Sequence, residues 1–272
     1  MLFRSAIGLD SNIPLARLTL DNTATDLLGA LTAATGAGTV TYSSSIVKVG
    51  TYSAFFNNTP GSSTVTTYLN YTVPASLNQP SAFTVSLWIY PTSYGLASAN
   101  MVPLSLSDNG NNAINFLFSS NGVVSSTYAT TVTTSATNQT SASTISLNAW
   151  THLALTFSAG VLSLYVNGSC VVSTAVAGNL CAPGGGNLTN LILGANRNGG
   201  SASNAFLGYI DDVRIYTTAL TSLQIANFYS NPAFQSVKVS SSTITGLSST
   251  AVATTPALVG LNANVVASAA LP

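Results

Sequence analysis

The chain has 272 residues, of which 46% are hydrophobic and only 4% are charged, with six basic and six acidic side chains that cancel. Ordinary globular domains carry about 25% charged residues, and this sequence contains no Glu at all. Six scattered basic residues cannot neutralise a run of phosphates, and no apolar run reaches the roughly 20 residues of a transmembrane helix, so we expect neither a nucleic-acid partner nor a membrane span.

A near-zero net charge favours association, because nothing repels neighbouring copies of the chain. We expect an exterior made mostly of Ser, Thr, Asn, Gly and Ala, as in a subunit packed among others or in a surface covered with sugar. The first ten residues, from Met1 to Asp10, lack the apolar segment of a secretory signal. Because the sequence retains Met1, we expect a protein that does not use the secretory route and is displayed on a virion or a cell surface.

Residues 1–17 have the composition of an irregular N-terminal arm, and short β-like runs separated by Gly, Asn, Pro and Ser follow over residues 18–234. Two of these runs alternate between apolar and other residues, which predicts strands with one buried face. The apolar positions are Phe83, Val85, Leu87 and Ile89 in the first run and Leu153, Leu155 and Phe157 in the second.

A β-hairpin is predicted at Asn167-Gly168, between the runs Leu162–Val166 and Ser169–Val172. A type I′ turn requires positive φ at both central residues, and Asn followed by Gly is the pair that meets this requirement best. A later run, Phe206–Tyr216, predicts a strand that passes through the sheet.

One short helix is predicted over Ser222–Tyr229, because Thr221 and Gln224 have the spacing of a capping box. Residues 235–272 form a low-complexity tail of Ser, Thr, Ala and Val. Ordering a residue costs about 1–2 kcal/mol of backbone entropy, so an ordered tail needs contacts that offset this cost. We expect this tail to pack on its own sandwich or on a neighbouring copy.

Several groups of residues, in chain order, resemble the laminin-G-like members of the concanavalin A-like lectin and glucanase family. They are Leu18–Asp21 with Asp26–Gly29, Phe83–Pro91, Trp150–Phe157 with Leu164–Gly168, Leu191–Gly194, and Gly208–Tyr216 with Ala219–Thr221. The resemblance implies an all-β fold, a two-sheet antiparallel jelly-roll sandwich with one short C-terminal helix and extended terminal arms. It also implies loops at one rim, or a concave face, that bind sugars or protein partners.

Enzymatic activity is not expected. The glucanases of this fold use a pair of Glu residues, and glycoside hydrolysis in general requires two carboxyl groups about 5–9.5 Å apart. Asp211 and Asp212 are neighbours in a predicted strand, so we expect their side chains to point to opposite faces. The single histidine, His152, is expected to pack on the sheet. A glycoside hydrolase is therefore the weakest interpretation.

A structural calcium ion is one interpretation of the acidic residues. Many proteins of this fold hold a calcium ion near the opening and closing strands, and the resemblance implies Asp26 and Asp211 as ligands, since hard cations prefer carboxylate and carbonyl oxygens. The alternative is an Asp–Arg ion pair together with an Asp that caps a turn.

The two cysteines leave two alternatives open. Cys170 and Cys181 could form a disulfide across a hairpin, closing a loop of about a dozen residues. Alternatively, they remain free thiols that pack as small hydrophobic side chains.

Sugar binding would require exposed aromatic side chains, but the sequence does not bring them to one place. The candidates are Trp88, Tyr90, Tyr94, Tyr128 and Tyr209. Trp88 and Tyr90 share one face of a predicted strand, although we expect both Trp88 and Trp150 to pack in the core.

The composition favours a non-catalytic structural module, held by contacts with other protein subunits of an assembly such as a capsid or virion. The alternative is a carbohydrate- or receptor-binding adhesin module. An arm and a tail buried against other chains would favour the first function, and an open aromatic surface would favour the second.

Overall fold

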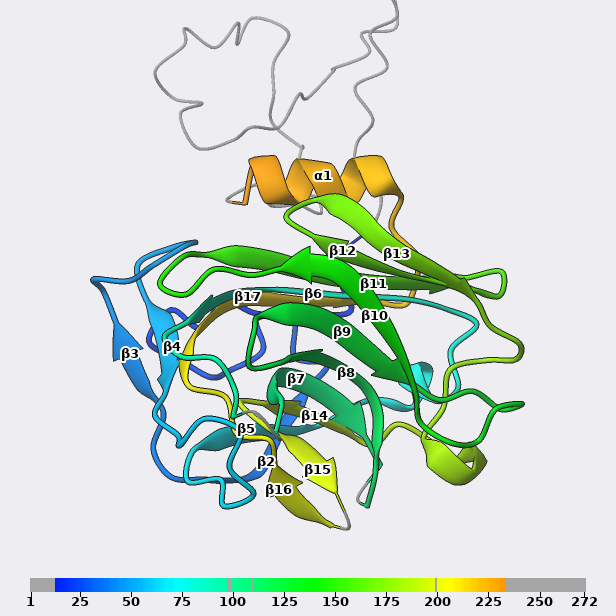
Figure 1. Cartoon of the computed structure of the whole chain (residues 1–272), viewed down its shortest axis with the longest axis horizontal. Helices are drawn as coiled ribbons and strands as arrows, with labels where there is room; N and C mark the ends of the chain where they lie inside the picture. Colours follow the sequence, from blue (N-terminus) through cyan, green and yellow to red (C-terminus); the bar gives the residue numbers. More distant parts are fainter. Residues whose placement is uncertain (1–12, 97–98, 109, 199, 233–272) are drawn as a thin grey trace, which may run out of the picture. The chain divides into compact units, whose positions relative to one another are not determined.

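Two antiparallel β-sheets pack face to face in the computed structural model, which describes residues 13–96, 99–108, 110–198 and 200–232 (Figure 1). The eight-stranded sheet has the strand order β13-β12-β11-β6-β17-β4-β3, with β1 paired to β17. The seven-stranded sheet has the order β10-β9-β8-β7-β14-β5-β2, and β15 and β16 form a separate hairpin. This is the two-sheet antiparallel sandwich with one short C-terminal helix that the sequence predicts.

The strands of the eight-stranded sheet are β1 (Ala16–Leu18), β3 (Thr41–Ser43), β4 (Ser53–Phe56), β6 (Ala82–Pro91), β11 (Thr151–Ser158), β12 (Val161–Val166), β13 (Ser169–Ala175) and β17 (Gly208–Tyr216). Those of the seven-stranded sheet are β2 (Thr32–Ala37), β5 (Tyr68–Thr72), β7 (Met101–Ser107), β8 (Asn112–Phe118), β9 (Val123–Tyr128), β10 (Thr137–Thr144) and β14 (Asn190–Leu193). The remaining elements are β15 (Asn196–Asn198), β16 (Ser201–Ser203), the helix α1 (Ser222–Ser230) and two short 3₁₀ turns at Ala75–Leu77 and Pro183–Gly185.

The core lies between the two sheets and follows the predicted alternation. The apolar positions of β6 and β11 are buried, and they face apolar side chains of the other sheet such as Leu104, Phe116 and Leu191. Burying one such side chain stabilises the fold by about 1.5–3 kcal/mol. The alternating pattern therefore sets which face of each strand points inward.

The predicted hairpin is confirmed: β12 and β13 are antiparallel, and Asn167 and Gly168 have φ values of 50° and 80°. The predicted helix is also confirmed, as α1, with Thr221 and Gln224 forming the capping box. This helix lies on the outer face of the eight-stranded sheet (Figure 1). A small second cluster holds it there, made of Ala154, Tyr165, Tyr216, Leu220, Ile225 and Phe228.

Residues 14–232 of the described chain lie in one compact unit, and its first strand starts at Ala16. The predicted packing of the tail, residues 235–272, and most of the predicted arm concern parts of the chain outside the described residues. Among the described residues, no helix combines the length and apolarity that crossing a bilayer requires.

A β-bulge interrupts β17 between Asp211 and Arg214, where the register with β6 shifts and Asp212 has a φ of 47°. The expectation that Asp211 and Asp212 point to opposite faces is therefore wrong. A bulge inserts an extra residue into one strand, so both carboxylates lie on the outer side of the sheet. There Asp211 binds the backbone of Lys48 and Asp212 binds Arg17.

Candidate functional site

The outer face of the eight-stranded sheet collects most of the ionised side chains that the structure describes. At its centre, the Asp212 carboxylate lies between two guanidinium groups, 2.7 Å from Nε of Arg17 and 2.6 Å from Nη2 of Arg214. Arg17 and Arg214 are brought together because β1 pairs with β17 in a register that places these two residues opposite each other. All three side chains are buried. This is the Asp–Arg pair that the sequence left as one alternative.

Asp26 caps the loop that follows β1. Its Oδ1 accepts hydrogen bonds from the backbone N–H groups of Arg17 and Leu28, and its Oδ2 accepts from those of Ala30 and Leu31, all at 2.7–3.1 Å. Four donors occupy the carboxylate, so a metal ion could bind only by displacing them.

Asp211 holds a second loop. Its Oδ2 accepts from the N–H groups of Lys48 and Val49, both at 2.9 Å, while its Oδ1 is fully buried and without a hydrogen-bond partner. Burial raises the pKa of Asp211 to about 7, outweighing the two N–H groups, which lower it. Asp21 holds the same loop, because its Oδ1 accepts hydrogen bonds from the N–H groups of Thr51 and Tyr52 at 2.6 and 2.9 Å. We call Asp21, Asp211 and the loop residues that they bind the loop clamp.

These residues do not fit the calcium site that the resemblance implied. Asp26 and Asp211 have separate structural partners, and the part of the chain that the structure describes contains no group of three or more His, Cys, Asp or Glu side chains placed to share an ion. The turn-capping alternative describes Asp26. The disulfide alternative is not found either, since Cys170 is an exposed free thiol and Cys181 a buried one.

An aromatic strip lies on the same outer face, beyond the loop clamp. It consists of Phe55, Tyr209, Tyr90 and Trp150, from β4, β17, β6 and the residue before β11. The ring centroids of successive members are 4.7 Å apart for Phe55–Tyr209, 5.8 Å for Tyr90–Tyr209 and 5.5 Å for Tyr90–Trp150. All four residues are half-buried.

The strip faces outward because of strand alternation. Three of its members are next to a residue that points into the core, in the pairs Ala54–Phe55, Ile89–Tyr90 and Tyr209–Ile210. The pairing register places Tyr209 opposite Phe55 on one side and opposite Tyr90 on the other. Residues far apart in the sequence thus form one continuous surface.

Trp88 borders the strip but is itself buried. Tyr229 of α1 stacks on its ring at 5.7 Å, His152 packs at 5.0 Å, and Nζ of Lys48 lies 4.0 Å from the ring centroid. Burial, followed by the charge of Arg214, lowers the pKa of His152 to about 3, so this imidazole is neutral at physiological pH. His152 therefore packs on the sheet, as expected from the sequence. Trp88 is buried, as expected, but it lies against α1 on the outer face rather than in the core between the sheets.

The other aromatic candidates have different fates. Tyr128 is buried in the core, and the half-buried Tyr94 donates its hydroxyl to the carbonyl oxygen of Ile145. Trp150 was expected in the core, but the structure leaves it half-buried in the strip. Sequence reasoning missed Phe55 and Trp150 as surface residues, because only the pairing of β4, β17 and β6 places them beside Tyr90 and Tyr209.

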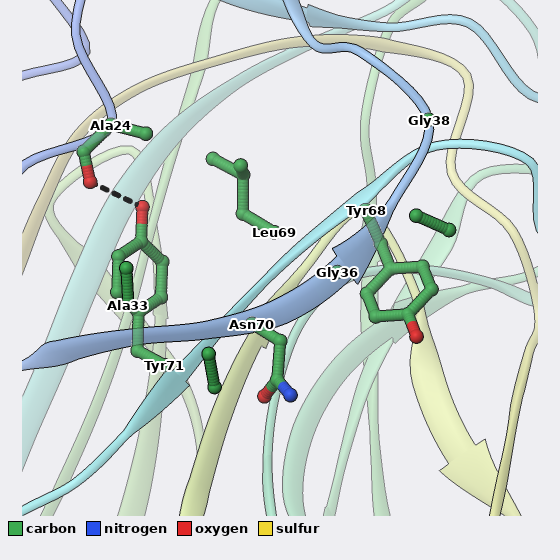
Figure 2. A pocket seen from close by; sticks show the side chains of 10 residues that line it. Ala24, Ala33, Gly36, Gly38, Tyr68, Leu69, Asn70 and Tyr71 are labelled. Carbon is green, nitrogen blue, oxygen red and sulfur yellow. Dashed lines mark hydrogen bonds between the residues drawn. The ribbon is translucent and has the colours of Figure 1, made fainter.

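A shallow hollow of about 230 Å³ lies at the edge of the other sheet, along β2 and β5 (Figure 2). Most of its lining residues are Ala, Gly or Tyr; the full set is Ala24, Ala33, Ala34, Gly36, Ala37, Gly38, Tyr68, Leu69, Asn70 and Tyr71. Two of its polar side chains are already bonded, since the Tyr71 hydroxyl donates to the carbonyl oxygen of Ala24 and the Asn70 amide donates to that of Thr35.

The middle of the outer face of the seven-stranded sheet is also covered. The β15–β16 hairpin packs there, against β7 and β8 (Figure 1). Ile192 and Ser105, which point to this face, are fully buried, and the Ser105 hydroxyl donates to the carbonyl oxygen of Ala195. The chain itself therefore covers this part of the sheet.

Comparison with solved structures gives matches over about four-fifths of the chain. Domain 4 of AbnA, an extracellular GH43 arabinanase from Geobacillus stearothermophilus, solved in complex with arabinotriose, is 22% identical with a TM-score of 0.60, covering 80% of this chain and 98% of that chain. The binding domain of Paraclostridial Mosquitocidal Protein 1 is 17% identical with a TM-score of 0.62, covering 81% and 52%. The binding domain of botulinum neurotoxin serotype G is 12% identical with a TM-score of 0.60, covering 80% and 51%.

The present chain spans about half the length of the two toxin chains. At these identities the likeness establishes the fold. No curated protein sequence matches this chain significantly. Residues 60–226 match a laminin-G family model described as the concanavalin A-like lectin/glucanases superfamily, and they make up more than half of the sequence. The chain belongs to the concanavalin A-like lectin/glucanase superfamily.

Proposed function

We propose that this chain is a carbohydrate- or receptor-binding module and that the aromatic strip is its contact surface. The observation that carries the proposal is the row of four half-buried rings, Phe55, Tyr209, Tyr90 and Trp150, on one face of the sheet. Aromatic side chains supply a large apolar contact area, and Tyr and Trp add a polar group at the edge of the ring. Such a surface binds ligands that are partly apolar and partly hydrogen-bonding, as sugars are.

Polar groups lie next to the strip. The exposed residue Asn148 lies two residues before Trp150 in the chain. Its backbone N–H donates to the carbonyl oxygen of Pro91, the residue that follows Tyr90. Its side-chain amide can both donate and accept hydrogen bonds. This combination of rings and an uncharged amide supports recognition of hydroxyl-rich ligands.

The related structures support a binding function. Domain 4 of AbnA was solved with arabinotriose, and the toxin regions are binding domains. A further similar structure, the binding domain of botulinum neurotoxin DC, was solved in complex with rat synaptotagmin II. AbnA is described as extracellular. By analogy, we place the present chain on the outside of a cell or particle.

Binding is proposed in preference to hydrolysis, although the superfamily includes glucanases. Asp212 is held by Arg17 and Arg214, and Asp211 is fully buried beneath the backbone of Lys48 and Val49. Neither carboxylate is free to protonate a leaving group or attack a sugar, as glycoside hydrolysis would require.

A role as a capsid-associated or virion protein rests on the charge-poor composition, and none of the related structures described above is a capsid protein. We therefore rank assembly with other protein subunits second. The specific observation in its favour is the absence of any charged residue between Asn109 and Asn196, which leaves little electrostatic repulsion between copies.

The experiment is a glycan-array and arabino-oligosaccharide binding screen of the wild type and of Trp150→Ala and Tyr90→Ala. The matched control is Tyr68→Ala, which removes a half-buried ring from the hollow in Figure 2. We expect the strip variants to lose binding while the control keeps it, with all variants melting as folded proteins. Loss of binding in Tyr68→Ala alone would assign the ligand to the hollow instead, and absence of any bound glycan would refute carbohydrate binding.

A further inference from the structure

We propose that the aromatic strip binds a chain of uncharged sugars, rather than a single sugar or an acidic glycan; this inference rests on the proposed function. Two independent features of the outer face carry it. One is the length and tilt of the row of rings. The other is the way in which every nearby ionised group is already occupied.

The strip is a row of distinct contact surfaces. Successive rings from Phe55 through Tyr209 and Tyr90 to Trp150 are separated by steps of 4.7, 5.8 and 5.5 Å. Their planes are tilted by 32°, 81° and 61°, so they do not form one flat platform. A single sugar ring can cover only part of this row, whereas successive units of a chain can contact successive rings.

The basic side chains that the structure describes already make contacts within the fold. The described residues include four, and Arg17 and Arg214 are both bound to Asp212. Arg197 lies in β15, which packs against β7 of the other sheet. Lys48 is the nearest to the strip, but its ammonium lies over the Trp88 ring and burial lowers its pKa.

The acidic side chains near the strip are occupied as well. Asp211 is fully buried, Asp212 is ion-paired, and Asp21 accepts the N–H groups of Thr51 and Tyr52. A sugar that carries a carboxylate, sulfate or ammonium group would lose water on binding without gaining a partner of opposite charge, which is unfavourable. A neutral sugar avoids this penalty, so the electrostatics of the face select for uncharged ligands.

The test is titration calorimetry with two matched sets of ligands. One set contains linear neutral arabino-, xylo- and gluco-oligosaccharides of one to six units, and the other contains sialylated, sulfated and uronic-acid oligosaccharides. We expect binding by at least one neutral series, with affinity rising more than tenfold from the monosaccharide to the longest chain and with little dependence on salt. Trp150→Ala should weaken the longest chain about tenfold, and Lys48→Met should leave its affinity unchanged.

The outcomes separate this inference from the proposed function. Tighter binding of an acidic series, weakened by salt and by Lys48→Met, would refute neutrality while leaving the binding function intact. Equal affinity for the monosaccharide and the longest chain would refute the extended ligand. Failure of every sugar in both sets to bind would refute carbohydrate binding by the strip as a whole.

Discussion

Arg17 lies directly opposite Arg214 in the pairing of β1 with β17, and both guanidinium groups contact the single carboxylate of Asp212. Two cations placed side by side in a buried location would repel each other without this anion. The opening and closing strands of the sandwich are therefore joined by a charge cluster as well as by backbone hydrogen bonds.

Removing the shared anion should destabilise the fold strongly. Asp212→Asn leaves both guanidinium groups buried without a compensating charge, for which we expect a loss of about 3–5 kcal/mol in the free energy of unfolding. Urea denaturation measures this loss. The matched control is the triple change Arg17→Met, Asp212→Leu and Arg214→Met, which removes all three charges and should be markedly more stable than Asp212→Asn. A single variant as stable as the wild type would contradict the account.

The pH dependence of stability should reveal Asp211. Its pKa rises from an ordinary value of 3.8 to about 7 in the folded protein, so the folded state holds this proton more tightly than the unfolded state. The resulting stability is present at low pH and is lost as the pH rises toward 7, by up to about 4 kcal/mol. Asp211→Asn keeps an oxygen for the N–H groups of Lys48 and Val49 and should remove this contribution to the pH dependence. Unfolding by denaturant from pH 4 to pH 8 is the measurement.

His152 should act in the opposite direction over an overlapping range. Its pKa falls from 6.5 to about 3 on folding, so below pH 6.5 the unfolded state binds a proton that the folded state does not. Stability from this group is therefore present above pH 6.5 and is lost as the pH falls. We expect the wild type to show a nearly flat profile between pH 4 and 6.5, because the two groups compensate.

Each single variant should reveal the pH dependence that the remaining group, His152 or Asp211, contributes to stability. Asp211→Asn is expected to become less stable as the pH falls, and His152→Gln to become less stable as the pH rises. The double variant should again be flat. Parallel profiles for the wild type and both single variants would show that neither group is shifted by folding.

The helix cap offers a smaller and cleaner test. Thr221→Ala removes the side-chain oxygen that accepts the N–H of Gln224, and loss of an N-cap typically costs about 1 kcal/mol. Thr218→Ala, three residues earlier and exposed, is the matched control and should cost far less. Thermal denaturation compares the two, and equal melting temperatures would exclude a contribution from the capping box.

The thiols can be counted directly. Cys170 is exposed and Cys181 is buried, so alkylation of the native protein without reductant should add one label. Denaturation without reductant should allow a second label, as measured by intact mass. A denatured protein that takes up no label would restore the disulfide alternative.

Local patterns predicted the elements that depend on neighbouring residues. The alternation around Leu87 and Leu155 identified the inward faces of β6 and β11, and Asn167-Gly168 identified the hairpin turn. The helix was predicted from the capping-box spacing of Thr221 and Gln224 and from residues close to them. In each case, the physical cause lies within a few residues of the feature.

The parts that failed depend on strand register. A two-residue period assumes an uninterrupted strand, but a bulge interrupts β17 at Asp212. The residue with positive φ there is not a glycine, so the sequence does not mark the bulge. The aromatic strip requires knowing that β4, β17 and β6 are adjacent, because Phe55 and Trp150 have no sequence feature linking them to Tyr209. For the same reason, Trp150 could not be distinguished from a core residue by its local pattern.

The strands of the seven-stranded sheet contain no Asp, Glu, Lys, Arg or His, whereas β1, β11 and β17 of the other sheet carry Arg17, His152, Asp211, Asp212 and Arg214. The strands of the two sheets therefore differ in how they can respond to the solvent. Within the strands that the structure describes, a change in acidity or ionic strength can act on charged side chains of one sheet, while the strands of the other sheet carry none. A response of the strands to acidity must therefore begin in the sheet that also bears the row of rings.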